Sequence, residues 1–362
     1  MTTKTAVPHQ AAARTRLPAS LVEIRRLFDA LDWTEMARQV AAEAQTGVAI
    51  VGPVNSGKST LFNTLKGREV SPVGAVPGTT QTMQYEEWGP FSLVDTPGFG
   101  EVRGVDRAKI ALEAVRGASV LVLVLDAVAG VRQADLGLLQ QLKAMGKPVV
   151  TVLNKMDLVA REDQERVLND ARDKLGEPGI IPISAKEGTN LAGALLPRLV
   201  DAQPALAVAL GRALPGYRRQ AANSVVRQAA VWNSVIGAEP VPGLDIPFLL
   251  AVQAQMVLRV AAIYGEPMSV QRARTMAATI VGGVALRYLA QQGAKLIPGP
   301  GWIVAGAIAG VGTWAIGQVA IRYFEHGKRL SPEEMQELYR SLLRNPRRRK
   351  ERKQRAREQA RD

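Results

Sequence analysis

The sequence contains no cysteine and only two histidines. The lack of cysteine excludes disulfides, thiolate metal sites and cysteine nucleophiles, and two histidines leave little for a zinc site. Residues 1–20 also lack an apolar run of secretory length, so we expect no export by a signal peptide. A reduced, cytoplasmic setting fits these absences.

Acidic residues are outnumbered, with 33 Asp and Glu against 46 Lys and Arg, which gives a net charge of +13. The excess is uneven, because residues 344–362 hold ten basic and three acidic side chains, a net of +7. A basic balance of this kind indicates phosphate-bearing partners, and charge alone does not choose between nucleic acid and an anionic membrane. The remaining composition, 47% hydrophobic and 22% charged, is typical of a folded chain of about two or three domains.

Composition divides the chain into four regions. They are an N-terminal extension with an amphipathic helix (1–46), an α/β domain (47–203), a helical domain rich in Ala and Gly (204–345) and a basic tail (346–362). The first helix is expected from Ser20, with an apolar stripe that continues to Leu31. We expect it to pack on the domain that follows it, and a membrane or partner contact is the alternative.

The second region alternates short apolar runs with amphipathic stretches. The runs GVAIV, FSLVD, SVLVLVLDA, PVVTVLNK and IIPISA predict buried strands, and helices are expected after Val105, Ala134, Glu162 and Asn190. Strands that alternate with helices predict an α/β fold with a doubly wound, mostly parallel sheet. Its ligand site is expected at the carboxyl ends of the strands.

A phosphate-binding loop is indicated directly after the first strand. Residues 52–59 read GPVNSGKS and precede a helix-like segment, which is the context that a P-loop requires. The glycines let backbone N–H groups converge on phosphate oxygens at a helix N-terminus. Lys58 supplies a cation to the terminal phosphates, and the Ser59 hydroxyl can ligate Mg²⁺. The predicted phosphate-site residues are Asn55, Ser56, Gly57, Lys58, Ser59 and Thr60.

Two further motifs, Asn154-Lys-Met-Asp157 and Ser184-Ala-Lys186, end other strands and predict base selection. The Asp157 carboxylate can accept from the ring N–H and the exocyclic amine of guanine together, which adenine does not offer. The Ala185 amide can donate to guanine O6. Guanine is therefore the expected base, contacted by Asn154, Lys155, Asp157, Ser184, Ala185 and Lys186.

A fourth motif, Asp95-Thr-Pro-Gly98, ends the strand FSLVD. Its acid can reach Mg²⁺ through water, and the Gly98 amide can sense a γ-phosphate. In order and spacing, the four motifs resemble the small GTPases of the Era, EngA and TrmE group, over residues 47 to about 203.

The resemblance implies a switch I element at Pro77-Gly-Thr-Thr80, where Thr80 matches a Mg²⁺ ligand. It implies binding of GTP and GDP, Mg²⁺ held by Ser59, Thr80 and Asp95, and hydrolysis of GTP. No general base is identifiable, and phosphoryl transfer needs mainly positioning and charge neutralisation. The residues expected to carry that electrostatic work are Lys58, Thr80, Asp95 and Gly98.

Two departures from Ras-type sites bear on the rate. Phe99 stands where Ras-like enzymes place the glutamine that orients water, so hydrolysis is expected to be slow until a partner, a dimer contact or a cation completes the site. Asn55 matches the asparagine with which potassium-activated relatives help to hold K⁺. The alternative is that Asn55 only suits the geometry of the loop.

In the third region, residues 296–321 contain no charged residue and no histidine. That length can cross a hydrocarbon core of about 30 Å. Residues 276–291 are also apolar except for Arg287, so a membrane hairpin is one reading. A Gly/Ala-rich hairpin buried in a soluble helical domain is the other.

Residues of about 220 to 330 resemble the YcjF-type domain of unknown function. This resemblance implies a bacterial protein with a membrane connection. The sequence therefore predicts a GTP-hydrolysing switch at the cytoplasmic side of the inner membrane, peripheral or integral, bound to anionic lipid with help from the basic tail. The alternatives are a cytoplasmic, ribosome- or RNA-associated GTPase like Era, and a GTP-driven homo-oligomeric scaffold.

Overall fold

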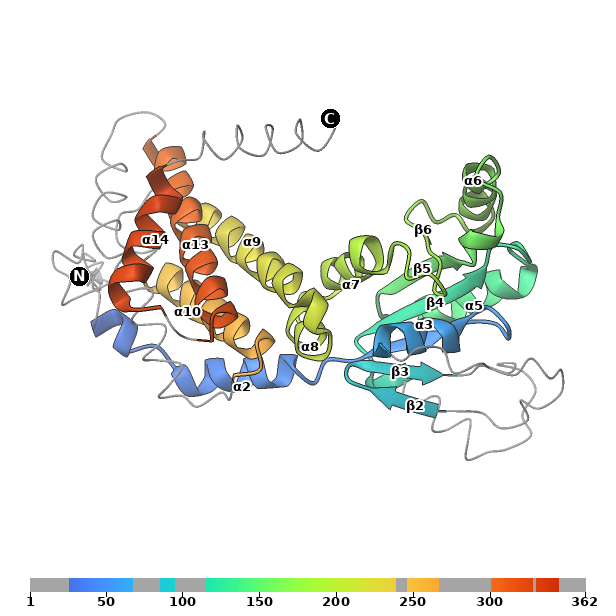
Figure 1. The fold of residues 1–362 in the computed structure, drawn as a ribbon, viewed down its shortest axis with the longest axis horizontal. Coiled ribbons are helices and arrows are strands. Elements are labelled where there is room, and N and C mark those ends of the chain that lie inside the picture. The colour runs from blue at the N-terminus through green and yellow to red at the C-terminus, as the bar shows by residue number, and fades with distance from the viewer. Residues whose placement is uncertain are drawn as a thin grey trace, which may run out of the picture.

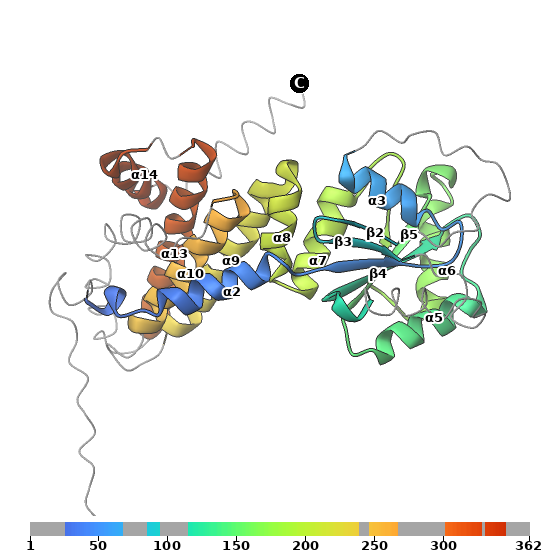
Figure 2. The ribbon, with the colours of Figure 1, turned by 90° about the horizontal axis from the view of Figure 1, so that it is seen from below.

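A computed structural model describes residues 26–67, 85–94, 115–238, 246–266, 301–327 and 330–344. The chain forms an α/β half and an all-helical half, which lie side by side along the longest axis (Figure 1). Figure 2 shows the same division from below, with α7 and α8 between the two halves.

The α/β half is built on a six-stranded sheet in the order β2-β3-β1-β4-β5-β6. All neighbouring strands are parallel except β2, which runs antiparallel to β3. The strands are β1 (Val48–Val51), β2 (Tyr85–Trp88), β3 (Phe91–Val94), β4 (Val120–Asp126), β5 (Val149–Asn154) and β6 (Ile181–Pro182). The predicted α/β fold is confirmed.

Helices cover both faces of this sheet (Figure 2). Alternate residues of β1 point to opposite faces, so Ile50 joins one hydrophobic core and Ala49 the other. The helices and helical turns of this half are α3 (Lys58–Lys66), α5 (Gln133–Ala144), the 3₁₀ turn Met156–Leu158, α6 (Gln164–Leu175), the π-helical segment Leu191–Leu195 and α7 (Leu196–Ala202). The helix expected after Val105 lies almost wholly outside the described residues.

The helical half is assembled around a close pair of helices. Its elements are α8 (Leu206–Ala213), the 3₁₀ turn Pro215–Tyr217, α9 (Arg218–Gly237), α10 (Ile246–Ile263), α13 (Gly301–Glu325) and α14 (Pro332–Arg344). A Cβ added to Gly306 of α13 would lie 2.5 Å from the Ser234 carbonyl oxygen of α9. Glycine at this position therefore lets the two helix backbones approach closely.

Polar side chains are buried where α9, α10 and α13 meet. Asn233 Nδ2 donates to Thr313 Oγ1 at 2.7 Å, and Gln253 Nε2 donates to the same oxygen at 2.9 Å. The three side chains are at most 2% exposed. Because buried polar groups are costly unless hydrogen-bonded, this network fixes how the three helices pack.

Two helices are long and apolar enough to cross a membrane by length and composition, Ile246–Ile263 and Ile303–Glu325. In each, most of the apolar window is buried within the protein, 67% and 61% respectively, and the core helix of a soluble protein passes the same test. Residues 276–291 and 296–300 of the predicted hairpin lie outside the described residues.

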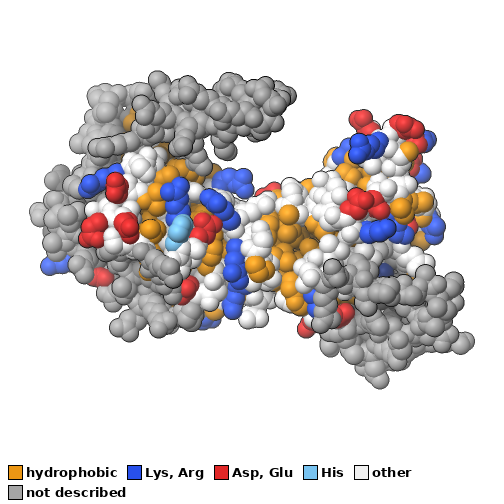
Figure 3. All heavy atoms as spheres, viewed as in Figure 1, with side chains coloured by type: hydrophobic (Ala, Val, Ile, Leu, Met, Phe, Trp, Pro, Cys, Tyr) orange, Lys and Arg blue, Asp and Glu red, His pale blue; other side chains and the backbone are white. Residues whose placement is uncertain are grey.

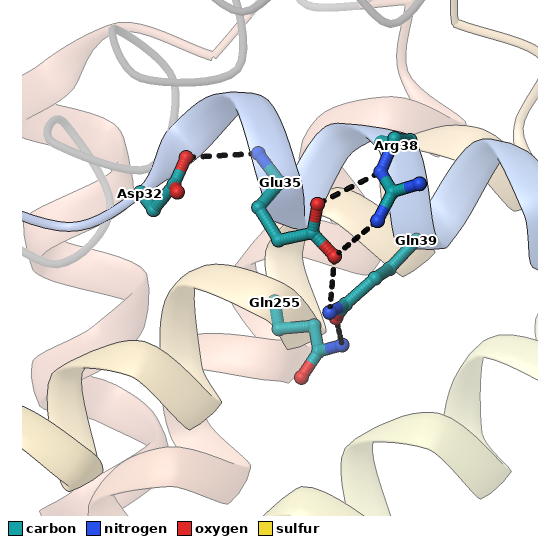
Figure 4. Close-up of polar contacts among 5 residues, drawn as sticks. All are labelled: Asp32, Glu35, Arg38, Gln39 and Gln255. Atoms are coloured by element: carbon teal, nitrogen blue, oxygen red, sulfur yellow. Dashed lines mark hydrogen bonds and ion pairs between the residues drawn. The ribbon is translucent and has the colours of Figure 1, made fainter.

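The N-terminal helix differs from the expectation. Within the described residues, 26–29 are helical, the chain then turns, and α2 (Trp33–Glu43) begins after Asp32, whose carboxylate accepts from the Glu35 N–H at 2.9 Å (Figure 4). α2 packs on α10 and α8 of the helical half. Residues 20–25 of the helix expected from Ser20 lie outside the described residues, so its packing on the following domain stays a prediction.

Side-chain contacts explain this placement of α2. Arg259 of α10 forms a half-buried bidentate ion pair with Glu43, with Nε 2.8 Å from Oε2. Gln255 Nε2 donates to Gln39 Oε1 at 3.2 Å (Figure 4). α2 leads directly into β1, and α7 leads into α8. The α/β half is therefore connected to the helical half at both ends of its sequence.

One hydrophobic core runs from the sheet through α7 and α8 into α9, α10 and α13. Hydrophobic side chains are also visible on the surface over the α7–α8 region (Figure 3). At the same junction, a Cβ added to Gly89, in the turn between β2 and β3, would lie 2.9 Å from Ala213 Cβ at the end of α8. The two halves are thus in direct contact at the β2–β3 turn.

Candidate nucleotide-binding site

The loop at residues 52–57 joins β1 to α3 through unusual backbone conformations. Gly52 has φ +150° and would collide with the Val124 carbonyl oxygen if it carried a Cβ. Asn55 and Gly57 have φ values of 65° and 92°, in the left-handed region. This succession of turns brings the loop back over the start of α3.

Lys58, the first residue of α3, is only 4% exposed, and its Nζ donates to the Pro53 carbonyl oxygen at 2.9 Å. The ammonium group is therefore held beneath the loop. In the described part of the chain no side chain caps α3, so the backbone N–H groups of its first turn are left without a side-chain acceptor there. Ser59 is exposed and Thr60 is half-buried in the same turn.

Ser56 supplies a test of whether these residues fit a phosphate group. Its Oγ is fully buried and has no hydrogen-bond partner among the described residues. A buried hydroxyl of this kind is costly unless it is paired. An orphaned donor beside a buried cation and an uncapped helix N-terminus fits an anionic group such as a nucleotide phosphate.

Asn154, at the end of β5, connects this loop to the predicted base site. Its Nδ2 donates to the Ser56 carbonyl oxygen at 2.8 Å, and its Oδ1 accepts from the Ala185 N–H at 2.9 Å. Thr64 of α3 donates to the Ala185 carbonyl oxygen at 2.7 Å. Asn154 is only 2% exposed. Its two hydrogen bonds join the phosphate loop, the end of β5 and the loop that contains Ala185 into one hydrogen-bonded unit.

Asp157 and Lys186 lie at the rim of this unit, half-buried and exposed respectively. Ser184 is buried, and its Oγ accepts from the Glu187 N–H at 3.2 Å, which shapes the loop. The Ala185 amide, predicted to donate to guanine O6, here donates to Asn154 instead. A guanine in this place would therefore share that N–H with the asparagine.

Thr80, Asp95, Gly98 and Phe99 lie outside the described residues. β3 ends at Val94, beside β1 in the sheet, immediately before Asp95. Of the predicted Mg²⁺ ligands, only Ser59 is described, at the start of α3.

Sequence reasoning missed one residue of this region, Asp126 at the end of β4. It forms an ion pair with Lys155, Nζ to Oδ2 2.6 Å. Burial would raise the pKa of Asp126, but hydrogen bonds from Lys155 and from the N–H groups of Val128 and Ala129 outweigh it and lower the pKa. The sequence could have indicated this residue, because Asp126 is the one acid in the apolar run SVLVLVLDA and stands near its end.

Comparison with known proteins agrees with this geometry. Residues 47–155 match the family described as 50S ribosome-binding GTPase, and residues 204–348 match the domain of unknown function DUF697. The chain is 37% identical to the GTPase Der of Desulforudis audaxviator over 211 residues, 55% of this chain and 46% of that protein. It is also 37% identical to the GTPase Der of Streptomyces coelicolor, over 54% and 43% of the two chains.

Among solved structures, the chain is similar to Era of Aquifex aeolicus bound to GDP and AlF₄⁻, with 27% identity, a TM-score of 0.36, and coverage of 51% of this chain and 66% of that one. This chain spans about half the length of the curated relatives that it matches. The two family matches confirm the resemblance found in the motifs. Within this chain, residues 47–155 therefore correspond to a GTPase domain and residues 204–348 to a DUF697 helical domain.

Proposed function

We propose that the protein binds GTP, hydrolyses it to GDP and phosphate, and acts as a nucleotide-dependent switch. The observation that carries this proposal is the hydrogen-bonded unit in which Asn154 joins the phosphate loop to the Ala185 loop, beside the buried Lys58. A site of this form supports simultaneous recognition of phosphates and of a purine.

In the proposed mechanism, Lys58 and the N–H groups at the start of α3 stabilise the negative charge that shifts on the phosphates. Ser59, Thr80 and Asp95 would hold Mg²⁺, which neutralises phosphate charge when bound, and the Gly98 amide would contact the γ-phosphate. Phe99 cannot accept a proton from water, so unassisted turnover is expected to be slow. Asn55 would help to hold K⁺ beside the phosphates.

Calorimetric titration of the full chain with GDP, GTP and ATP tests this site. We expect binding of both guanine nucleotides, weak binding of ATP, and loss of all binding in Lys58→Ala. Lys174→Ala, which removes an exposed lysine of α6, is the control. Phosphate release at matched ionic strength should be faster in K⁺ than in Na⁺, and equal rates would remove the role of Asn55. A folded protein indifferent to guanine nucleotides would remove the proposal.

Two connections support transmission of the nucleotide state to the helical half. The β2–β3 hairpin joins the segment that contains Thr80 to the segment that begins at Asp95, and its turn touches Ala213 of α8. α2 is paired with α10 through Glu43 and runs into β1, which precedes the phosphate loop. A change in the loops around a γ-phosphate therefore has two short paths to the helices.

The proposed place of action is the cytoplasmic face of a bacterial inner membrane. On α13, Gly306 faces α9 and Thr313 lies where α9 and α10 meet, whereas Ile303 and Val311 of the same helix are exposed. Val231 and Val235 are exposed on α9, the helix that packs on α13. These four side chains, which we call the α9–α13 face, are 49–61% exposed and present a branched apolar surface to solvent.

Charge favours a lipid occupant for this face. α14 packs on α13 and runs back towards the end of the domain where α13 begins (Figure 1). The sequence then continues into residues 344–362, with their net charge of +7. An apolar face combined with a polybasic segment matches an anionic leaflet, where each basic residue adds about 1 kcal/mol. Since α10 and α13 share the buried polar network with α9, we propose peripheral attachment by this face.

Flotation with vesicles of phosphatidylcholine, alone or mixed with phosphatidylglycerol, tests the attachment. We expect the full chain to float with the anionic vesicles, high salt to weaken binding, and Val235→Asp to weaken it further. Leu158→Asp, at an exposed position of the GTPase domain, is the matched control. Equal flotation of Val235→Asp and wild type would exclude the face, and no flotation of wild type would exclude the membrane role and leave the nucleotide switch.

A ribosome- or RNA-associated GTPase is the second candidate, favoured by the family description and by relatives named GTPase Der. Co-sedimentation with ribosomes, retained when vesicle binding is absent, would select it. The third candidate is a homo-oligomeric scaffold. GTP-dependent pelleting without lipid or RNA would select that one.

A further inference from the structure

The ends of β4 and β5 carry an ion pair beside the base-recognition loop. Asp126 is paired with Asn154 in the sheet register, and Lys155 is the first residue after β5. The Lys155 Nζ lies 2.6 Å from Asp126 Oδ2, and the two side chains are 29% and 17% exposed. This contact therefore joins the loop that follows β5 to the loop that follows β4.

The Asp126 carboxylate is itself held in place. Its Oδ1 accepts from the Val128 N–H at 2.9 Å and from the Ala129 N–H at 3.3 Å, while Oδ2 faces Lys155. Both oxygens are therefore used, and the orientation of the carboxylate is fixed by the turn after β4. A fixed anion at this point can orient the lysine that it binds.

The backbone of Lys155 needs such support. Its φ of 67° lies in the left-handed region, which costs a non-glycine residue about 1 kcal/mol or more. On one side, Asn154 binds the phosphate loop, and the Ala127 N–H donates to the Asn154 carbonyl oxygen at 2.9 Å. Asp126 holds the side chain of Lys155, and the 3₁₀ turn that carries Asp157 follows at once.

We propose that Asp126 is a positioning residue for guanine recognition: by binding Lys155 it fixes the left-handed turn and so aims Asp157 at the exocyclic amine of the base. This inference rests on the proposed function, because it assigns a further residue to the same site. It predicts that Asp126 affects which purine is preferred as well as how tightly the nucleotide binds.

Titration of the full chain with GDP and with inosine diphosphate, which lacks the exocyclic amine, provides the test. In Asp126→Asn, whose amide oxygen still accepts from the turn but lacks charge, we expect GDP affinity to fall about tenfold. The preference for GDP over inosine diphosphate should fall with it. Asp126→Glu retains the charge and should keep most of that preference. Glu177→Gln, which removes the ion pair with Lys143 elsewhere in the domain, should change neither.

A double-mutant cycle separates positioning from stability. In a Lys155→Met background, Asp126→Asn should have little further effect on the GDP preference, because the two residues act together. An unchanged preference in Asp126→Asn, or an equal loss of affinity for both nucleotides with a lower melting temperature, would overturn the inference. Failure of the wild-type chain to bind either nucleotide would instead overturn the proposed function.

Discussion

The side chain of Asn154 occupies the space in which a side chain on Gly57 would begin. A Cβ added to Gly57 would overlap Asn154 Nδ2, the atom that donates to the Ser56 carbonyl oxygen. Glycine is therefore required before Lys58 for two reasons. Its φ of 92° lies in the left-handed region, and the neighbouring asparagine leaves no room for a Cβ. This contact makes the phosphate loop and the base loop depend on each other.

Gly57→Ala should consequently abolish nucleotide binding with only a modest loss of stability. The left-handed backbone costs about 1 kcal/mol, and displacement of Asn154 breaks the link between the loops. Gly67→Ala is a matched control, because Gly67 also has a left-handed φ of 72° but no described residue lies within 4 Å of its added Cβ. Melting temperature and GDP affinity distinguish the two, and normal GDP binding by Gly57→Ala would contradict the prediction.

Asp157→Asn should weaken the preference for guanine over adenine nucleotides by about a hundredfold, because an amide cannot accept from both N–H groups of guanine. The new amide can donate to a carbonyl oxygen, so xanthosine diphosphate should bind better than it does to wild type. Competition titrations measure both changes. Unaltered selectivity for GTP over ATP would defeat the assignment of this carboxylate to the base.

Much of the GTPase half is predictable from sequence because its signals are local. The first six residues of β4, 120–125, are buried on both faces of a parallel sheet, so they read as one apolar run. The phosphate loop is likewise contained in residues 52–59. β2 was missed because Tyr85–Trp88 has two glutamates at its centre, which an edge strand tolerates.

The remaining features depend on contacts between distant residues. Asn154 and Ser56 are 98 positions apart, and Arg259 and Glu43 are 216 apart. No periodicity shows that α2 pairs with α10 instead of the domain after it. The apolar run of α13 was equally ambiguous, since a membrane helix and a buried core helix both need apolar side chains, and only packing separates them.

Packing of α13 on α9 leads to a stability prediction for Gly306→Ala. The added Cβ would meet the Ser234 carbonyl oxygen at 2.5 Å, a backbone atom that cannot move aside, so we expect a loss of about 1–3 kcal/mol. Gly137→Ala in α5 is the control. No atom of the described ranges lies within 4 Å of its added Cβ, and helix propensity should make it stabilising by about 0.5–1 kcal/mol. Urea unfolding of both variants checks the difference, and equal stabilisation would contradict close packing of the two helices.

Alkaline stability should depend on Tyr217, which is buried in the 3₁₀ turn between α8 and α9. Burial, reinforced by Asp201 and opposed by Arg227, raises the pKa of Tyr217 from 10.0 to about 12. The folded protein therefore retains the phenolic proton more tightly than the unfolded chain does, and this contribution is complete below pH 10.0 and lost as pH rises towards about 12. Tyr217→Phe removes this dependence on the phenolic proton. Between pH 10.0 and about 12, the unfolding free energy of the variant should therefore decline less than that of wild type, by on the order of 2 kcal/mol. Urea unfolding at about pH 9 and about pH 11.5 measures the two slopes, and parallel declines for wild type and variant would show that Tyr217 does not govern alkaline unfolding.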